Sequence, residues 1–306
     1  MDSQHNLWPG LPFEEWQDTY ATLHLWTQIV GKIRLTLTPW TNHSWHVPLY
    51  VTSRGLTTTL IPYGSRGFQV DFDFIDHKLR IETCEAFKWS MDLKPQTVSY
   101  FYTSVMNALA AMGMPVTINK KPNEIVDPIP FDKDEVHSSY DPECVHQFWR
   151  ILVHSDRIFK QFRTRFIGKC SPVHFFWGSF DLAVTRFSGR KAPLHPGGVP
   201  NIPDWVVQEA YSHEVYSCGF WPGGGALPFP VYYAYAYPEP PDFREANVRL
   251  LNAFYSEDLS EFILPYEDIR TSDTPDNDLI AFLQKTYEAA ADLGQWDRNS
   301  LEQVTA

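Results

Sequence analysis

The sequence predicts an α+β protein made of two similar halves, each a helix, an antiparallel sheet and a second helix. Two observations predict this class. Segments with apolar residues at helical spacing alternate with groups of short segments in which apolar and polar residues alternate singly. A Pro-rich stretch at residues 120–142 separates an N-terminal half, residues 1–119, from a C-terminal half, residues 143–306. We expect the halves to be fused into one compact unit.

The composition describes a globular protein and limits its partners. Of the 306 residues, 43% are hydrophobic and 20% charged, which is enough apolar material for a substantial core. The net charge of −12 argues against binding to nucleic acid, because that task needs a basic surface. No apolar run approaches the roughly 20 residues that span a bilayer, and the first ten residues lack a signal-peptide pattern. We therefore expect neither a nucleic-acid nor a membrane partner.

The cysteine spacing indicates the compartment. Cys84, Cys144, Cys170 and Cys218 are far apart and form no Cys-x-x-Cys pair. This pattern is typical of neither a zinc knuckle nor a dense disulfide framework. A reducing compartment suits such cysteines, so the sequence predicts a cytoplasmic protein.

The first half begins with a predicted helix. Apolar residues recur at helical spacing over residues 14–30, and Gly31 follows as a helix stop. Residues 32–39 alternate apolar and polar side chains, which predicts a half-buried strand. A further strand is expected over residues 45–52, with His46 on the face that points away from the core.

Residues 68–77, FQVDFDFIDH, alternate more regularly than any other segment. From Phe68 to Phe74 the apolar side chains at even positions predict a buried face, and the polar ones at odd positions predict a solvated face. A return strand at residues 79–83, a helix over residues 97–112 that ends at Gly113, and a short strand at residues 115–119 complete this half.

The second half repeats this order. A helix begins at Asp141 and ends near residue 167, strands follow, and a helix is predicted over residues 276–293. Short echoes, such as Val-Gly-Lys at residues 30–32 and Ile-Gly-Lys at residues 167–169, favour an internal duplication as the origin of the two halves.

Residues 167–190 combine ionisable with bulky aromatic side chains, and we expect them to form one buried strand. Alternation along a single strand would place His174 on one face and Asp181 on the other. A β-bulge at Gly178 could shift the register and bring Asp181 to the face of His174.

A second candidate strand covers residues 209–218, EAYSHEVYSC. His213 and Glu214 are adjacent in it, so their side chains should point to opposite faces. The Gly-rich loop that follows lacks the Lys-Ser or Lys-Thr of a phosphate-binding P-loop, and a mobile lid carrying Trp221 is an alternative interpretation.

These strands supply the candidate catalytic residues, which are His174, Asp181, His213 and Glu214. Two histidines and one carboxylate on neighbouring strands would form an open site for a divalent transition metal. We therefore expect His174 and His213 as metal ligands, with Asp181 or Glu214 as the carboxylate.

His46 and His77, at strand positions of the first half, are the alternative metal ligands. The competing explanation for every one of these histidines is structural. A buried imidazole among aromatic rings can donate to a backbone carbonyl and take no part in chemistry.

The aromatic content of 15%, with 11 Trp and 15 Tyr, indicates a concave surface lined with rings in addition to a core. The candidate substrate-binding residues are Trp177, Arg186, Trp221, Tyr233 and Tyr235. We expect an enzyme that acts on a small polar or aromatic metabolite, with a divalent metal as one option for its cofactor. The alternative is a non-catalytic small-molecule binding protein with an aromatic-lined pocket.

Several long motifs resemble a known family. The segments SPVHFFWGSFDLAVTRFSGR, EAYSHEV and GFWPGGG are similar to those of an uncharacterised bacterial family of about this length, classed only as a domain of unknown function. The resemblance covers nearly the whole chain. It implies no activity, cofactor or catalytic residue.

Overall fold

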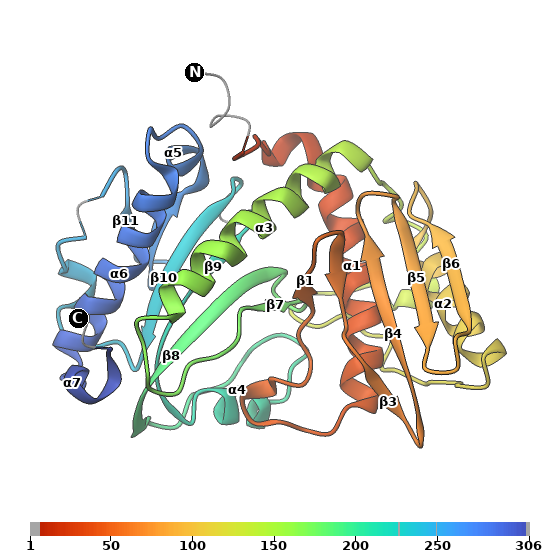
Figure 1. The fold of residues 1–306 in the computed structure, drawn as a ribbon, viewed down its shortest axis with the longest axis horizontal. Coiled ribbons are helices and arrows are strands. Elements are labelled where there is room, and N and C mark those ends of the chain that lie inside the picture. The colour runs from red at the N-terminus through yellow and green to blue at the C-terminus, as the bar shows by residue number, and fades with distance from the viewer. Residues whose placement is uncertain (1–6, 226, 249, 304–306) are drawn as a thin grey trace.

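The structure is a computed structural model that describes residues 7–225, 227–248 and 250–303. It contains two six-stranded antiparallel sheets with helices packed on them (Figure 1). The α+β class is therefore confirmed, together with the order of helix, antiparallel sheet and helix in each half. The duplication itself stays a prediction.

The first half runs from α1 to α2. Its elements are α1 (Phe13–Leu37), η1 (Asn42–Ser44), β1 (Tyr50–Val51), β2 (Gly55–Thr57), β3 (Ile61–Tyr63), β4 (Arg66–Asp73), β5 (Lys78–Thr83), β6 (Lys88–Asp92) and α2 (Val98–Ala111). The strands lie in the order β1-β2-β4-β5-β6, and β3 pairs with the beginning of β4.

The second half follows the short η2 (Phe131–Lys133). Its elements are α3 (Pro142–Arg163), β7 (His174–Phe176), β8 (Asp181–Lys191), α4 (Asp204–Ala210), β9 (His213–Trp221), β10 (Val231–Tyr237), η3 (Phe243–Glu245), β11 (Phe254–Ser256), β12 (Glu261–Pro265), α5 (Tyr266–Arg270), α6 (Pro275–Leu293) and α7 (Arg298–Leu301). The strands lie in the order β11-β12-β10-β9-β8-β7.

The two sheets meet at one edge. Leu49, just before β1, forms an antiparallel bridge with Phe175 of β7. The Leu49 amide donates to the Phe175 carbonyl at 2.9 Å, and the Phe175 amide donates back at 3.0 Å. The edge strand β7 is therefore covered by the first half, as an exposed edge of a sheet requires.

The inner face of the first sheet packs on α1 and α2. Phe72 of β4 stacks on Phe101 of α2, and Phe101 stacks on Trp26 of α1 with ring centroids 4.8 Å apart. The prediction for the even positions of residues 68–74 is confirmed, because Phe68, Val70 and Phe72 of β4 and Phe74 just after it are buried. Asp73 departs from the solvated face that is predicted for the odd positions. It is buried and paired with two arginines.

Helices α3 and α6 cover one face of the second sheet (Figure 1). Tyr216 of β9 donates its hydroxyl to the carbonyl of Leu283 in α6 at 2.9 Å. Tyr232 of β10 bonds Ser155 of α3 at 2.9 Å. Each of these buried tyrosines therefore has a hydrogen-bond partner for its hydroxyl, as buried polar groups require.

The long helix α1 lies between the two sheets (Figure 1), and every residue from Thr22 to Arg34 is buried. The predicted strand over residues 32–39 is therefore wrong, since α1 continues through Gly31 to Leu37. A helix that is enclosed on all sides has no solvent face, so its sequence loses the periodicity from which a helix is predicted. Gly31 serves close packing here, because an ideal Cβ at this position would lie 2.3 Å from the Trp177 indole.

Three other expected strands differ in the structure. The strand over residues 45–52 is reduced to the two residues of β1, and residues 115–119 form no strand. The single strand expected over residues 167–190 is a hairpin, in which β7 and β8 flank a turn at residues 177–180. Residues 209–210 end α4, so β9 begins only at His213.

The Pro-rich segment at residues 120–142 packs against the rest of the chain. Phe131, Asp134 and Tyr140 are buried within it. Lys32 of α1 donates to the carbonyl of Lys121 at 2.6 Å. The segment therefore has tertiary contacts along its length, although it carries no regular element except η2.

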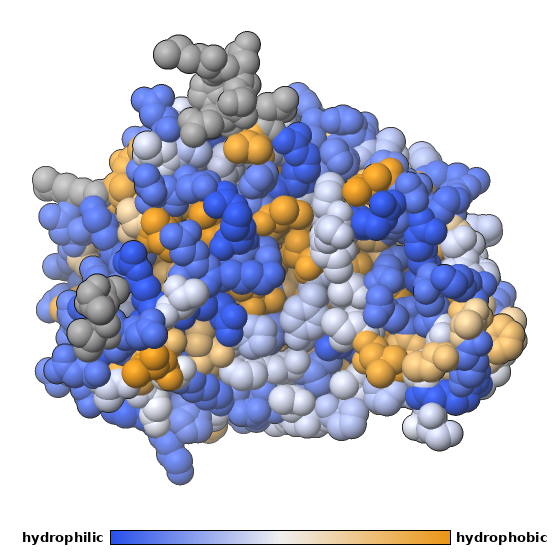
Figure 2. All heavy atoms as spheres, viewed as in Figure 1, coloured by the Kyte–Doolittle hydropathy of each residue, from blue (hydrophilic) through white to orange (hydrophobic). Residues whose placement is uncertain are grey.

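The polarity of the surface, the state of the cysteines and the helix composition show no special feature in the described residues. The face seen in Figure 2 is mostly hydrophilic, with apolar side chains in small separate groups. All four cysteines are free. In the described ranges no helix combines the length and apolar content needed to cross a membrane.

The packing of Gly31 against Trp177 generates a stability prediction. In Gly31→Ala the new methyl group would force the indole away from α1. We expect a net loss of about 1–3 kcal/mol in the free energy of unfolding, even though alanine gains roughly 1 kcal/mol over glycine in a helix. Urea unfolding at neutral pH measures the difference.

The control is Gly10→Ala, where a Cβ has no neighbour within 4 Å. Equal stability of the Gly31 variant and wild type would contradict this packing.

Candidate functional site

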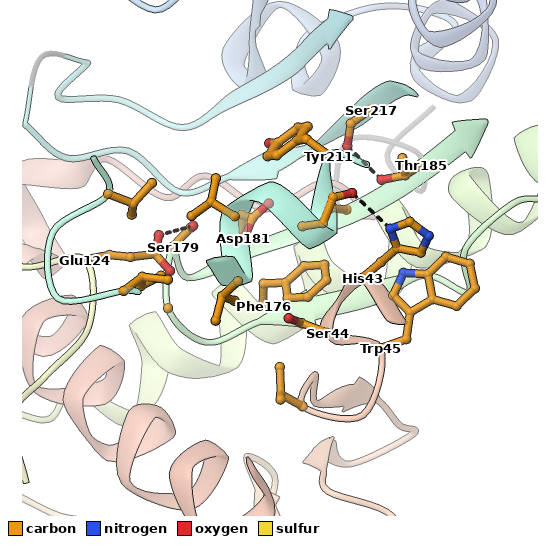
Figure 3. A pocket seen from close by; sticks show the side chains of 18 of the residues that line it. His43, Ser44, Trp45, Glu124, Phe176, Ser179, Asp181, Thr185, Tyr211 and Ser217 are labelled. Carbon is orange, nitrogen blue, oxygen red and sulfur yellow. Dashed lines mark hydrogen bonds between the residues drawn. The ribbon is translucent and has the colours of Figure 1, made fainter. Parts of the chain in front are cut away.

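A cavity of about 340 Å³ lies against the second sheet, on the face opposite α3 and α6 (Figure 3). Its floor is formed by alternate residues of β8 from Asp181 to Phe187 and by parts of β9 and β10. The cover is formed by α4, by residues 199–203 and by the turn around η1. The six residue steps from Asp181 to Phe187 extend over roughly 20 Å, so the cavity is elongated along that strand.

The β7–β8 hairpin directs Asp181 into this cavity. Phe176 pairs with Asp181, and His174 pairs with Ala183. Residues directly opposite each other in an antiparallel pair share a face, so His174 and Asp181 lie on the same side of the sheet. The expected shared face is thus reached through a hairpin turn and not through a bulge. Phe180 closes the turn in a left-handed conformation, with φ of 60°.

Helix α1 holds the turn at residues 177–180. The Trp177 indole packs on Gly31 and donates to the carbonyl of Val47 at 2.9 Å. His24 of α1 lies 2.7 Å from the carbonyl of Gly178, to which its Nε2–H donates. Burial lowers the pKa of His24 to about 4, so this imidazole is neutral at pH 7. The position of Asp181 therefore depends on contacts made by a helix of the other half.

Asp181 is the most strongly perturbed acid of the cavity. Its side chain is buried, with 8% of its surface exposed, and Oδ2 accepts a hydrogen bond from the Tyr233 hydroxyl. Burial raises the pKa of Asp181 to about 7, against the opposing effect of the Tyr233 hydrogen bond, and the nearby Glu124 raises it further. A carboxyl group with such a pKa exchanges a proton readily at neutral pH.

Glu124 is a second carboxyl group of the same wall. Its Oε2 accepts a hydrogen bond from Ser179 at 2.5 Å, and burial raises its pKa. The side chain crosses over Gly178, where a Cβ would lie 2.0 Å from Oε1. Figure 3 shows Glu124 and Ser179 at one end of the cavity, with Asp181 between them and the His43–Trp45 end.

His43 marks that opposite end. Its Nδ1–H donates to the carbonyl of Ala210 at 2.9 Å, and Nε2 accepts from Lys169 at 2.5 Å. Burial lowers the pKa of His43, so the ring is neutral. Between the two ends, Thr185 and Ser217 form a hydroxyl pair in the floor at 2.9 Å.

A second cavity of about 660 Å³ adjoins the first. Residues that line both are Ser179, Asp181, Tyr211, Tyr233 and Tyr235. The hydroxyls of Tyr211 and Tyr235 are 2.7 Å apart. Glu261 lines the second cavity only, and burial raises its pKa to about 8. Asp181 and three tyrosines therefore lie where the cavities meet.

The predicted substrate-binding residues fall into two groups. Trp177, Tyr233 and Tyr235 line the first cavity, and Trp221 lines the second. Arg186 lies on the opposite face of β8, where its guanidinium carbon is 3.5 Å from the centre of the Phe162 ring. It donates to the carbonyl of Phe162 at 2.5 Å and lines neither cavity.

The structure does not bring His174 and His213 together. His174 pairs with Ala183 near the start of β8, whereas His213 pairs with Lys191 at its end. Two rings separate them in space: Trp45 contacts His174, His43 contacts Trp45, and His213 contacts His43. Neither histidine lines either cavity.

The remaining candidates have local partners. Glu214 is ion-paired with Arg190 at 2.7 Å, away from Asp181. The Nδ1 of His46 accepts from the Thr41 amide at 3.2 Å. His77, in the first half, bonds the Tyr140 hydroxyl at 2.9 Å. Among the residues with described positions, no group of three or more His, Cys, Asp or Glu side chains is arranged to hold a metal ion.

Glu124 and His43 were absent from the predicted site. Glu124 lies in an irregular Pro-rich segment, where no periodicity indicates which way a side chain points. His43 belongs to the turn before β1 and meets the cavity only because this turn crosses over the second sheet. Both are brought in by long-range packing between the halves, which leaves no local pattern in the sequence.

His174 yields a prediction of its own. Both ring nitrogens are buried without a hydrogen-bond partner in the described structure, among the rings of Trp45, Tyr50 and Phe176. Burial lowers the pKa of His174 to about 3, helped by the charge of Arg34. As the pH falls below about 6.5, the unfolded chain binds a proton at this position and the folded chain does not.

Stability should therefore decline on acidification because of His174. At about 1.4 kcal/mol per pKa unit, the contribution lost between pH 7 and pH 4 is roughly 3 kcal/mol. His174→Phe removes this loss, so its unfolding free energy should fall less than that of wild type over this range. Urea unfolding at several pH values measures it, with His146→Phe on α3 as the control. Parallel pH profiles for the His174 variant and wild type would show that the ring is not held neutral.

The chain matches a protein family over nearly its whole length. No curated protein and no solved structure matches the chain. One family matches, and it covers residues 8–303, which include both halves and every residue of the two cavities. The chain therefore belongs to the family of unknown function DUF5996.

Proposed function

We propose that this protein is an enzyme that binds a small molecule in the cavity over β8 and transfers protons through Asp181. The observation that carries the proposal is the state of this carboxyl group. It lines a cavity, is buried, and has a pKa of about 7. Strongly perturbed ionisable groups at the wall of a cavity are concentrated at functional sites.

The surroundings of Asp181 suit acid–base chemistry. In its acid form the carboxyl group donates a proton to a substrate atom, and in its carboxylate form it accepts one. Tyr233 can donate a hydrogen bond to the carboxylate that remains after proton transfer. Burial raises the pKa of Tyr233 well above its ordinary value, so the phenol keeps its proton and remains a donor.

The rest of the cavity supports binding and orientation. Its walls are mainly apolar and aromatic, with few polar groups at defined places. The Thr185–Ser217 hydroxyl pair offers hydrogen bonds at mid-cavity, and His43 offers a neutral imidazole at the far end. A substrate that fills the cavity would therefore be fixed at several points relative to Asp181.

Conversion of a metabolite tests the proposal. The purified protein is incubated with a defined mixture of small metabolites at pH 7, and mass spectrometry follows compounds that disappear and appear. We expect at least one conversion by wild type that is lost in Asp181→Asn, because the amide cannot exchange a proton, and is reduced in Tyr233→Phe. Asp258→Asn, an exposed position in the turn after β11, is the control. Binding without conversion, or conversion that persists in Asp181→Asn, would overturn the proposed catalytic role.

The cost of burying Asp181 gives an independent prediction. Its folded pKa of about 7 exceeds the ordinary value of 3.8, so the unfolded chain releases a proton that the folded chain retains. Stability is therefore lost as the pH rises from about 4 to 7. Asp181→Asn lacks this penalty and should be more stable than wild type by roughly 2–4 kcal/mol at pH 8, and equally stable at pH 4. Urea unfolding at both pH values measures this, and a variant that is less stable at pH 8 would refute the raised pKa.

A further inference from the structure

We infer that the ligand of this site is a small organic cation, in which a protonated amine is attached to an apolar body. The inference rests on the proposed function for the location of the site, but not on the catalytic role of Asp181. It follows from the cavity's shape, from the charges that face it and from its aromatic walls.

The charges facing the two cavities are of one sign. Glu124, Asp181 and Glu261 come from three separate segments of the chain. Glu124 lines the first cavity, Glu261 lines the second, and Asp181 lines both. None of the three forms a salt bridge with a described residue. Their hydrogen-bond donors are neutral hydroxyls, from Ser179 for Glu124 and from Tyr233 for Asp181.

No basic side chain of the described residues is ion-paired with these three acids. Among the described lining residues of both cavities there is no lysine and no arginine. The two histidines that line them, His43 and His195, have pKa values lowered by burial and are neutral. A buried carboxylate without a cation is costly, and a bound ammonium group would supply the missing partner.

The same carboxyl groups lie among aromatic rings. Tyr233 and Tyr235 stack with centroids 6.1 Å apart and face both cavities. Trp177 lines the first cavity and Trp221 the second. A cation held over the face of such rings gains about 0.5–2 kcal/mol, and binding sites for ammonium groups combine rings with acids in this way. An anion would meet both the carboxyl groups and the negative ring faces, so this chemistry disfavours it.

The apolar body of the ligand is inferred from the end of the first cavity near His43. Phe187, whose ring lies 4.7 Å from that of His43, lines the floor there, and Val207, one turn before the Ala210 carbonyl that His43 bonds, lines the cover. These side chains bury apolar surface of a ligand but offer it no polar partner. A cavity of about 340 Å³ lies at the small end of the range for ligand sites, which is roughly 300–1,000 Å³. The cation is therefore small, with its ammonium group at the acidic end and its body along β8.

Matched pairs of probes separate charge from shape. The amines are benzylamine, 2-phenylethylamine and tryptamine, and each is compared with the alcohol that replaces its amino group. Binding is measured by isothermal titration calorimetry at pH 7.5, where the amines are protonated. We expect at least one amine to bind about tenfold or more tightly than its alcohol, and 3-phenylpropionate to bind no better than the alcohols.

The variants locate the charge. Glu124→Gln and Asp181→Asn keep the shape of each side chain, and each should weaken binding of that amine about fivefold or more while leaving the alcohol unchanged. Glu14→Gln, an exposed carboxyl group in the first turn of α1, is the control and should leave both unchanged. The inference is overturned if no amine binds more tightly than its alcohol, including the case in which no probe binds, or if the preference survives both substitutions.

The two proposals fail separately. Amine binding that depends on Glu124 and Asp181, but with no conversion of any metabolite, leaves the inference standing and removes the enzymatic role. Conversion of a neutral or anionic metabolite that depends on Asp181, with no preference for amines, leaves the enzymatic role and overturns the inference.

Discussion

The contact between α1 and the turn at residues 177–180 is the constraint on which the rest of the structure depends. Gly31 has no side chain, so the Trp177 indole can lie directly on the helix. The indole then donates to the carbonyl of Val47, and His24 bonds the carbonyl of Gly178. Any shift of this turn would move Asp181, the first residue of β8, and with it the wall of the cavity.

This constraint also explains why two halves form one site. The second half supplies the floor through β8, β9 and β10, while the turn around η1 and Glu124 come from chain segments before α3. Arg34 of α1 fixes the course of that first segment by donating to the carbonyls of His46 and Pro48 at 2.8 and 2.5 Å. The helix therefore holds both walls of the cavity in one arrangement.

Two buried aspartates show how differently this fold treats carboxyl groups. Burial alone would raise the pKa of Asp73, but hydrogen bonds from Arg54, from the amides of Asp76 and Ile75, and from Arg80 lower it to about 2. Among the described residues Asp181 accepts from the Tyr233 hydroxyl and has no arginine partner, so burial dominates and its pKa rises to about 7. Asp73 fits a structural ion pair, whereas Asp181 retains a proton that it can give up, at a cost in stability that is typical of functional sites.

The pattern of apolar and polar residues predicts a helix or strand correctly where one face is buried and the other is solvated. It fails where the element is buried on all sides. The alternation in β4 and the cap at Asp141 before α3 indicate elements that the structure contains. The enclosed end of α1 and the tight hairpin after β7 were misjudged, because full burial removes periodicity and a four-residue aromatic turn resembles a strand. Trp177, Tyr233 and Tyr235 are predicted from the excess of aromatic residues, and Asp181 from a segment that mixes ionisable with aromatic side chains, whereas Glu124 depends on long-range packing.

The ionisation of Asp181 in solution is the most direct measurement of the central claim. Protein labelled with ¹³C at the aspartate carboxyl carbons is titrated by NMR, and Asp181→Asn identifies the resonance. The structure predicts a midpoint near pH 7 that moves down in Glu124→Gln, since Glu124 contributes to the raised pKa of Asp181. A midpoint near the ordinary 3.8 for this carboxyl group would contradict the account, because the cavity would then hold a permanently ionised aspartate with no proton to transfer at neutral pH.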